Sequence, residues 1–372
     1  MGEAAGVILH ELSTGDMVIW NKRYDAVFIK FNQACKVLST SDMNGGYRED
    51  LQGVFNCRLV YGKNGEGPAW TAARKTELRD LPAALALDPG KTTGMGTAGA
   101  MEHVAIAAKT FETLTVTAIV TARIEDGAMR AGDQVSALRA GSRKCRAVLE
   151  AIHIILVLDA DMPPGTLARA LVTCSEAKTA ALQELMAGSL YSCSLATGTC
   201  ADQTIVLANP VSPLYLETAG KHSKLGELIG RAVKQAVKEA LVKQGGASSS
   251  KRCSIMQRFK RFGLNETTLW RQYAACTEQP VEKKEFMGLW SRLDGDPELL
   301  AWSSLYIHLL DQHLWGLLPV RQLQVAGQRL IDGAAGACCV PVPVIQQPSL
   351  PVCLQAWETL LISCCLRQKH ID

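Results

Sequence analysis

The 372-residue sequence lacks the features that would send a protein out of the cytoplasm or into a membrane. Its first ten residues have neither the basic start nor the apolar core of a secretory signal peptide. The apolar stretch 299–320 is interrupted by two histidines, an aspartate and a proline, so we do not expect it to span a membrane. These absences predict a cytoplasmic protein.

The chain also lacks a strong net charge and the common hydrolase motifs. Its 39 basic and 36 acidic residues nearly balance, which gives no support for a nucleic-acid or anionic-membrane partner. There is no His-x-x-x-His pair, Walker-type loop or Gly-x-Ser-x-Gly elbow, so metalloprotease, nucleotide-hydrolase and α/β-hydrolase functions lack support. Hydrophobic residues make up 48% of the chain, which is enough to build a sizeable core.

Thirteen cysteines are present, but no two of them have Cys-x-x-Cys spacing. The pairs Cys338-Cys339 and Cys364-Cys365, with Cys353 between them, leave a metal or cluster site open as an alternative. Ordinary reduced thiols are the favoured interpretation.

Apolar patterns predict an α+β domain in the first two thirds of the chain. The period-two alternation over 114–124 indicates a half-buried strand, and the continuous apolar run 152–158 indicates a central strand covered on both faces. Another short strand is expected at 204–208. Apolar residues at helical spacing predict helices over 166–187 and 223–243.

A change in composition divides the chain. The segment 244–252 is rich in small and polar residues, which predicts a linker. It separates an α+β domain at 1–243 from a helical extension at 253–372 that is rich in tryptophan and cysteine. The sequence does not disclose the role of this extension, and an interaction or assembly function is one alternative.

Hydroxyl-bearing turns are concentrated between regular segments in residues 171–230, and sites tend to form on such turns when a rigid scaffold holds them. Lys178 falls in the centre of the apolar stripe of its helix. A buried ammonium needs a carboxylate, a ligand or carbonyl groups as partners, unless its head reaches solvent. Glu176 points to the other side of the same helix, where a solvated residue is the simpler interpretation.

Three further features suggest chemistry, and each has a structural alternative. Gly198, in the turn 196–199, allows close backbone approach to a ligand, and neighbouring N–H groups could form an oxyanion hole. His222 precedes a helix and can act as a general acid or base near neutral pH, although a surface or capping histidine is common there. His153, inside a strand, is expected to be a hydrogen-bonded core histidine.

Taken together, these residues resemble the adenosylcobinamide amidohydrolase family over roughly residues 35–242. The resemblance rests on an ordered set of short segments: Asn44-Gly45-Gly46, Gly96-Thr97-Ala98, Arg130-Ala131-Gly132-Asp133, Glu176-Ala177-Lys178-Thr179, Ala196-Thr197-Gly198-Thr199 with Asp202, and Ala219-Gly220 through His222 to Leu225-Gly226-Glu227. It implies hydrolysis of the amide that joins the aminopropanol arm to the corrin ring, giving adenosylcobyric acid and 1-amino-2-propanol in corrinoid salvage. Cobalt then belongs to the substrate, and the protein itself is expected to need no cofactor.

A weaker similarity, to the self-processing L-aminopeptidase/D-esterase fold, concerns architecture alone. It implies a layered sandwich of two mainly antiparallel sheets flanked by helices, with the C-terminal helical extension added. The processing nucleophile of that fold has no counterpart, because Ala151 occupies the nearest position.

The chain departs from the family pattern in three places. Where members usually read Gly-Thr-Ile-Asn, residues 150–153 read Glu-Ala-Ile-His, and residues 197–202 read Thr-Gly-Thr-Cys-Ala-Asp in place of Thr-Gly-Thr-Gly-Thr-Asp. Lys221 also stands where a threonine is common. The substitutions at 150–153 and 200–201 motivate the alternative of a non-catalytic corrinoid-binding protein.

The resemblance and the chemistry of amide cleavage together suggest roles for individual residues. We expect His222 as the acid/base and the 197–199 turn around the oxyanion, with other polar groups orienting them or the corrin amides. The predicted catalytic residues are His222, Thr197, Thr199, Asp202 and Glu176, and the predicted substrate-binding residues are Lys178, Gly198, Asn44, Thr97, Asp133 and His153. The expected partner is a small corrinoid, without nucleic acid or membrane, and homo-oligomer formation stays open.

Overall fold

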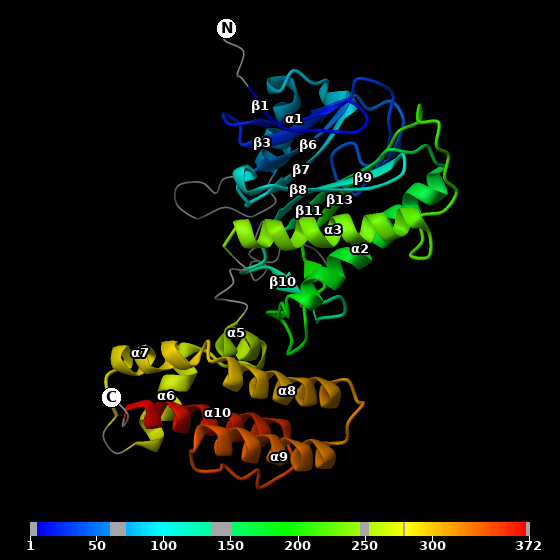
Figure 1. The fold of residues 1–372 in the computed structure, drawn as a ribbon. Coiled ribbons are helices and arrows are strands. Elements are labelled where there is room, and N and C mark those ends of the chain that lie inside the picture. Colours follow the sequence, from blue (N-terminus) through cyan, green and yellow to red (C-terminus); the bar gives the residue numbers. More distant parts are fainter. Residues whose placement is uncertain (1–5, 60–71, 135–149, 246–252, 278–279, 370–372) are drawn as a thin grey trace. The chain divides into compact units, whose positions relative to one another are not determined.

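A computed structural model describes residues 6–59, 72–134, 150–245, 253–277 and 280–369. The chain divides into two units, residues 1–248 and 249–372 (Figure 1). Most of the predicted linker at 244–252 lies outside the described residues.

The first unit contains two large β-sheets. One has the strand order β1 (Val7–Glu11), β2 (Met17–Asn21), β3 (Ala26–Lys30), β6 (Gly53–Arg58) and β7 (Thr92–Thr97). The other has the order β5 (Gly46–Arg48), β4 (Lys36–Ser39), β13 (Gln203–Ala208), β11 (Ile152–Leu158), β9 (Leu114–Ala122) and β8 (Ala105–Phe111). Neighbouring strands are antiparallel except for β6 with β7 and β11 with β13.

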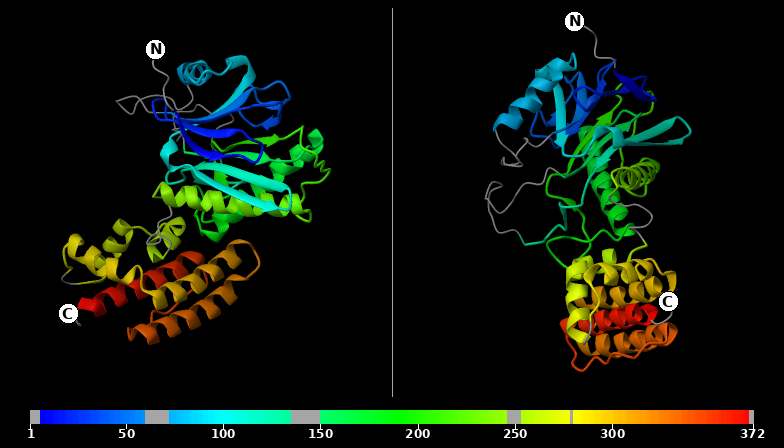
Figure 2. Two further views of the ribbon diagram at one scale, coloured as in Figure 1. Left: turned by 45° about the horizontal axis from the view of Figure 1, so that its top comes forward. Right: turned by 90° about the vertical axis from the view of Figure 1, so that its left-hand side faces the viewer.

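Helices cover the outer faces of both sheets. Helix α1 (Ala72–Ala84) lies on the first sheet, and α2 (Pro164–Glu184) and α3 (Lys224–Lys243) lie on the second (Figures 1 and 2). The predicted sandwich of two mainly antiparallel sheets between helical layers is therefore confirmed. Short elements complete the described part of the unit: the pair β10 (Ala128–Met129) and β12 (Gly198–Thr199), and the 3₁₀ turns η1 (Pro89–Lys91) and η2 (Met101–His103).

The alternation of side chains along β11 explains the layering. Ile152, Ile154 and Leu156 pack with the buried residues of α2 and α3, whereas Ile155 and Val157 pack between the two sheets. Both faces of the strand are buried because each faces another layer. The prediction of a central strand covered on both faces is confirmed.

Strand β9 differs from its prediction in burial. It was expected to be half-buried, but all its residues from Val116 to Ala122 are buried. Only Thr115, near the start of the strand, is partly exposed. Its alternating apolar residues face the helices, and Thr121 lies between the sheets, where its Oγ1 accepts a hydrogen bond of 2.7 Å from the Asn56 side chain. A hydroxyl that has a partner can be buried without a large loss of free energy.

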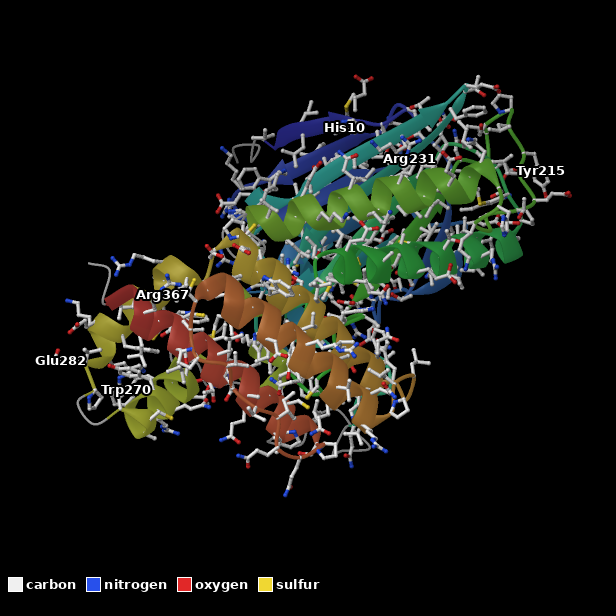
Figure 3. All side chains as sticks on the ribbon, turned by 60° about the horizontal axis from the view of Figure 1, so that its bottom comes forward. His10, Tyr215, Arg231, Trp270, Glu282 and Arg367 are labelled. Carbon is white, nitrogen blue, oxygen red and sulfur yellow. The ribbon has the colours of Figure 1, made fainter. Side chains whose placement is uncertain are left out.

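The second unit is helical in its described part, as predicted for the extension. Its elements are α5 (Ile255–Phe259), η3 (Lys260–Phe262), α6 (Glu266–Cys276), α7 (Lys283–Leu293), α8 (Pro297–Leu314), α9 (Val320–Cys338) and α10 (Leu350–Lys369). Trp357 stacks on Tyr306 in the core with ring centroids 4.3 Å apart. Arg261 forms two hydrogen bonds, of 2.5 and 2.7 Å, to the buried carboxylate of Asp311. The side chains of Trp270, Glu282 and Arg367 lie at the surface of this unit (Figure 3).

Two sequence expectations concern the character of the chain as a whole. Among the described residues, no helix combines the length and the apolar character that crossing a membrane would require. The cysteines that the structure describes are not joined in disulfides, and in the same part of the chain no three His, Cys, Asp or Glu side chains are grouped as a metal site.

Candidate functional site

One edge of the second sheet gathers polar segments that are distant in the sequence. Strands β11 and β13 run parallel, so their first residues, Ile152 and Gln203, lie at the same edge. Strand β9 runs antiparallel to β11, and its last residue, Ala122, pairs with Ile152. The turn that precedes β13 and the segment that follows β9 therefore meet at this edge, where β12 and β10 pair with each other.

An ion pair between Lys178 and Asp202 stands at the centre of this edge. The Nζ atom of Lys178 lies 2.5 Å from Oδ2 of Asp202, and the two side chains are only 14% and 12% exposed. Lys178 projects from α2, and Asp202 directly precedes β13. The buried lysine thus has the carboxylate partner that its place in the apolar stripe required.

The Asp202 carboxylate is fully occupied. Its Oδ1 accepts hydrogen bonds of 2.7 Å from the backbone N–H of Ile152 and from the hydroxyl of Thr199. Its Oδ2 accepts from the backbone N–H of Thr199 at 3.0 Å as well as from Lys178. A carboxylate offers about four acceptor positions, and all are used here. Asp202 therefore holds the turn and the lysine in place and has no lone pair left to act as a free base.

Lys178, by contrast, has more N–H donors than acceptors among the described residues. Among the described residues, Asp202 is its one hydrogen-bond acceptor, and an ammonium group carries three N–H donors. Within the described part of the chain, two N–H groups of this nearly buried cation therefore have no acceptor and can bind a ligand. A lysine held in this way is suited to bind a carbonyl oxygen or the oxyanion that forms from it.

Gly198 makes room for the ion pair. A Cβ atom built at this position would lie 2.3 Å from Oδ2 of Asp202 and 2.9 Å from Nζ of Lys178. Both distances are far below van der Waals contact, so a side chain here would displace the pair. A glycine is thus needed in this turn because other groups approach its backbone closely, as predicted. These groups are the side chains of Asp202 and Lys178, whereas a ligand was expected.

Thr197 links the turn to its neighbours. Its Oγ1 accepts a hydrogen bond of 2.9 Å from the backbone N–H of Ala131, and its carbonyl accepts one of 3.2 Å from the hydroxyl of Thr179 on α2. In the part of the chain that the structure describes, the Thr197 hydroxyl proton has no acceptor, so it can be donated to a ligand.

Asp133 closes the turn that follows β10. Its Oδ2 accepts from the backbone N–H of Arg130 at 2.8 Å and from the hydroxyl of Ser189 at 2.6 Å. Burial would raise the pKa of the Asp133 carboxyl, but hydrogen bonds from Ser189, Ser192 and Arg130 outweigh it and hold the pKa below its usual range. Asp133 is therefore ionised at neutral pH and ties the 130–133 turn to the loop that contains Ser189.

His153 supports the site from within the core and is 1% exposed. Its Nδ1 lies 3.0 Å from the side-chain amide of Asn56, and its Nε2 lies 3.2 Å from the carbonyl oxygen of Ala201. Burial lowers the pKa of the ring to about 4, although Asp202 and the Ala201 carbonyl oppose the shift. The ring is therefore neutral at neutral pH, and only one of its two nitrogens carries a hydrogen that it can donate. The expected core histidine is confirmed, and it acts on the site through the backbone beside Asp202.

Two predicted substrate-binding residues have structural contacts elsewhere. Asn44 adopts a left-handed conformation, with φ of +49°, and its amide donates to the carbonyls of Pro89 and Thr92 at 2.8 and 2.7 Å. It thereby fastens the β4–β5 turn to the start of β7. Thr97 is fully buried at the end of β7, where its Oγ1 accepts from the backbone N–H of Gly99 at 3.3 Å.

Glu176 and His222 lie on the other side of α2. Glu176 and Lys178 are two residues apart, so they project about 200° apart around the helix axis. The Glu176 carboxylate pairs with Nζ of Lys221 at 2.8 and 2.9 Å, and both side chains are exposed. His222 follows Lys221 and is exposed just before Ser223, the N-cap of α3. The structure does not bring these two predicted catalytic residues together with the Lys178–Asp202 pair.

Sequence reasoning missed several residues that support the site. Asn56 and Thr121 form a buried hydrogen-bonded row with His153 between the sheets. Glu150 is 2% exposed and accepts from Nε of Arg123 at 2.7 Å and from the backbone N–H of Asp126 at 2.6 Å. The available signal was a polar residue inside an apolar strand, as with Asn56 in the segment VFNC.

Comparison with known proteins agrees with this arrangement. A sandwich of two sheets between helices with a half-buried lysine–carboxylate centre at one sheet edge is compatible with a hydrolase. Residues 9–249, more than half of the chain, match the adenosylcobinamide amidohydrolase family, so the chain belongs to that family and the resemblance seen in the sequence is confirmed. The assignment supports hydrolase activity, and the match includes every predicted site residue.

The chain is also similar to a protein that is described as uncharacterized. The chain is 34% identical over 161 residues to an uncharacterized protein of Methanocaldococcus jannaschii. The match covers 40% of this chain and 62% of that relative, so it spans less than two thirds of the relative's length.

Proposed function

We propose that this protein hydrolyses the amide that joins the aminopropanol arm to the corrin ring of adenosylcobinamide. Water adds to the amide carbonyl carbon, the C–N bond breaks, and the amine leaves with a proton. The products are adenosylcobyric acid and 1-amino-2-propanol. Membership of the family supports the substrate, and the Lys178–Asp202 pair supports the reaction type.

The proposal depends on one observation: two of the three N–H donors of Lys178 have no acceptor among the described residues. Amide hydrolysis passes through a tetrahedral intermediate whose oxygen carries negative charge. An ammonium group that is 14% exposed and fixed by Asp202 needs little reorganisation to stabilise that charge.

The remaining roles follow from the contacts of the turn. Asp202 and Thr199 orient Lys178, and His153 fixes the Ala201 backbone from the core. Because His222 is exposed on the other side of α2 from Lys178, we do not propose it as the acid/base of the reaction. We further propose that the reaction serves corrinoid salvage in the cytoplasm and that cobalt enters and leaves with the substrate.

The alternative of a corrinoid-binding protein without activity rests on the departures at 150–153 and 200–201. In the structure these departures meet, because Nε2 of His153 contacts the carbonyl of Ala201. That contact is to the backbone, so it does not depend on the side chain at position 201. Lys178, Gly198 and Asp202 form a closely packed arrangement, which favours an active enzyme.

Product analysis tests the proposed reaction. Purified full-length protein is incubated with adenosylcobinamide in water enriched in heavy oxygen, and the products are weighed by mass spectrometry. We expect adenosylcobyric acid with one heavy oxygen in its new carboxylate, together with free 1-amino-2-propanol. Binding of adenosylcobinamide without loss of aminopropanol would instead establish the non-catalytic alternative.

A further inference from the structure

We propose that Leu190 and Tyr191, at the tip of the loop 188–195, form an apolar platform on which the corrin ring of the substrate lies. This inference rests on the proposed function and assigns a ring-binding subsite beside the amide-cleaving centre. Four observations support it: the rigidity of the loop, the exposure of its tip, its distance from Gly198, and the chemistry of the ring.

The loop is held firmly at its base. Gly188 and Leu195 form a β-bridge, and the backbone N–H of Ser189 donates to the carbonyl of Ser194 at 2.8 Å. Ser189 is 2% exposed, and its hydroxyl donates to Asp133 while accepting at 3.1 Å from the backbone N–H of Tyr191. The tip is therefore preorganised, and a ligand that binds there does not have to order the loop.

The tip presents apolar surface to solvent. Leu190 is 45% exposed and Tyr191 is 55% exposed. Single exposed apolar side chains are common on protein surfaces, so exposure alone would carry no argument. Here the two exposed side chains are adjacent, and they lie on a fixed loop whose base is hydrogen-bonded to Asp133.

The distance to the amide-cleaving centre follows from strand pairing. The backbone N–H of Leu190 donates to the carbonyl of Ala128 at 3.0 Å, and Ala128 pairs with Thr199 in the β10–β12 ladder. Leu190 is thus two strand spacings from the Gly198–Thr199 strand, about 10 Å, which is the scale of a tetrapyrrole ring. A ring that lies on the tip can reach Lys178 with an amide on its rim.

The chemistry of the ring suits this surface. A corrin has methyl-bearing, largely apolar faces and a rim of amide side chains. A leucine and a tyrosine provide an apolar face, and tyrosine does so at a small cost in side-chain entropy. Arg130 and Asp133 are the polar neighbours of the loop, because Arg130 donates to the carbonyl of Leu195 and Asp133 accepts from Ser189. Two side chains are too small an area for a protein partner, which needs about 800 Å² on each side.

A matched pair of double variants tests the platform. In Leu190→Ser/Tyr191→Ser the proposed platform is removed. In Val211→Ser/Tyr215→Ser two equally exposed residues, at 58% and 54%, are changed in the segment after β13. The six residues of β13 separate that segment from Asp202 by about 20 Å, and Figure 3 shows Tyr215 projecting away from the unit. Kd and KM for adenosylcobinamide and kcat are measured in the full-length protein, with the unfolding temperature as a check on folding.

We expect the platform variant to raise Kd and KM by about tenfold or more while kcat stays within about threefold, because the ring contact is made equally in the ground and transition states. The control variant should match the wild type. If the wild type hydrolyses the substrate and the platform variant binds it as tightly as the wild type, or loses kcat alone, the platform is wrong and the proposed function stands. If the wild type neither binds nor hydrolyses adenosylcobinamide, the proposed function itself fails.

Discussion

At the scale of single residues, the site depends on one ion pair and the glycine that makes room for it. The sequence left two alternatives for Lys178, a buried ammonium with a partner or a head that reaches solvent, because helical periodicity places it in an apolar stripe. It could not predict that the partner is Asp202, because a turn between distant elements brings the two together. It also predicted that His153 is a hydrogen-bonded core residue, but the partners of that residue depend on the packing of two sheets.

Replacing Gly198 by alanine tests the packing of the ion pair. The new Cβ would lie 2.3 Å from the Asp202 carboxylate, so the pair must move and Lys178 loses its position. We expect kcat/KM to fall by about 10²-fold or more, the usual loss when one oxyanion donor is removed. Gly165→Ala is the control, because a Cβ there meets open space in the first turn of the same α2 helix. Equal activity of the two variants would contradict the packing argument.

Replacing His153 by asparagine tests the buried neutral histidine. Its folded-state pKa of about 4 lies below the ordinary 6.5, so between these values the unfolded chain binds more protons than the folded one. The neutral His153 therefore makes its full contribution to stability above about pH 6.5. As the pH falls toward 4, this contribution is lost, and the free energy of unfolding decreases by about 3 kcal/mol. Asparagine does not titrate, so we expect the stability of His153→Asn to fall less than that of the wild type between pH 6.5 and 4. Thermal unfolding in a pH series measures this difference. An unchanged pH dependence would show that the histidine is not buried in its neutral form.

At the scale of elements, α2 presents opposite faces to two polar clusters. Helical periodicity alone predicted that Glu176 and Lys178 point in opposite directions. What it could not predict is which face meets the 196–202 turn, because that depends on the sheet on which α2 packs. The structure assigns the half-buried cluster to Lys178 and the exposed one to Glu176, Lys221 and His222.

Replacing His222 by alanine separates the two clusters. Because His222 is exposed on the far side of α2 from Lys178, we expect turnover to stay within about threefold of the wild type. Loss of a true general base typically costs about 10²–10⁴-fold. A loss of that size, with unfolding temperature and Kd unchanged, would restore His222 as the acid/base and would require the exposed cluster to be part of the site.

At the scale of the whole molecule, all predicted site residues and the family match lie within the first unit, apart from the last residue of the match, at 249. The layered sandwich was predicted from resemblance, not from periodicity. Periodicity predicts strands but not which sheet they join, because the parallel pairings of β6 with β7 and β11 with β13 connect segments far apart in the chain. The helical unit has a different limit. Nothing in its sequence resembles the family, so the sequence predicts no role for it.

Truncation after Gly245 tests the independence of the first unit. Its three hydrophobic clusters are formed by its own residues, so we expect the shortened protein to fold and to keep turnover within about threefold of the full chain. Solution mass and product formation are measured for both forms. A folded but inactive fragment, or a change in the number of associated chains, would assign the extension a part in the site or in assembly.

The most direct test of the central claim compares Lys178 of α2 with Lys221, which pairs with Glu176 on the opposite face of that helix. Lys178→Met removes the proposed oxyanion donor, and Lys221→Met removes the partner of Glu176. Product formation from adenosylcobinamide is measured at saturating substrate, with Kd and unfolding temperature as checks. The account predicts that kcat falls by about 10²–10³-fold in Lys178→Met and stays within about threefold in Lys221→Met. Full turnover by folded Lys178→Met protein would contradict it.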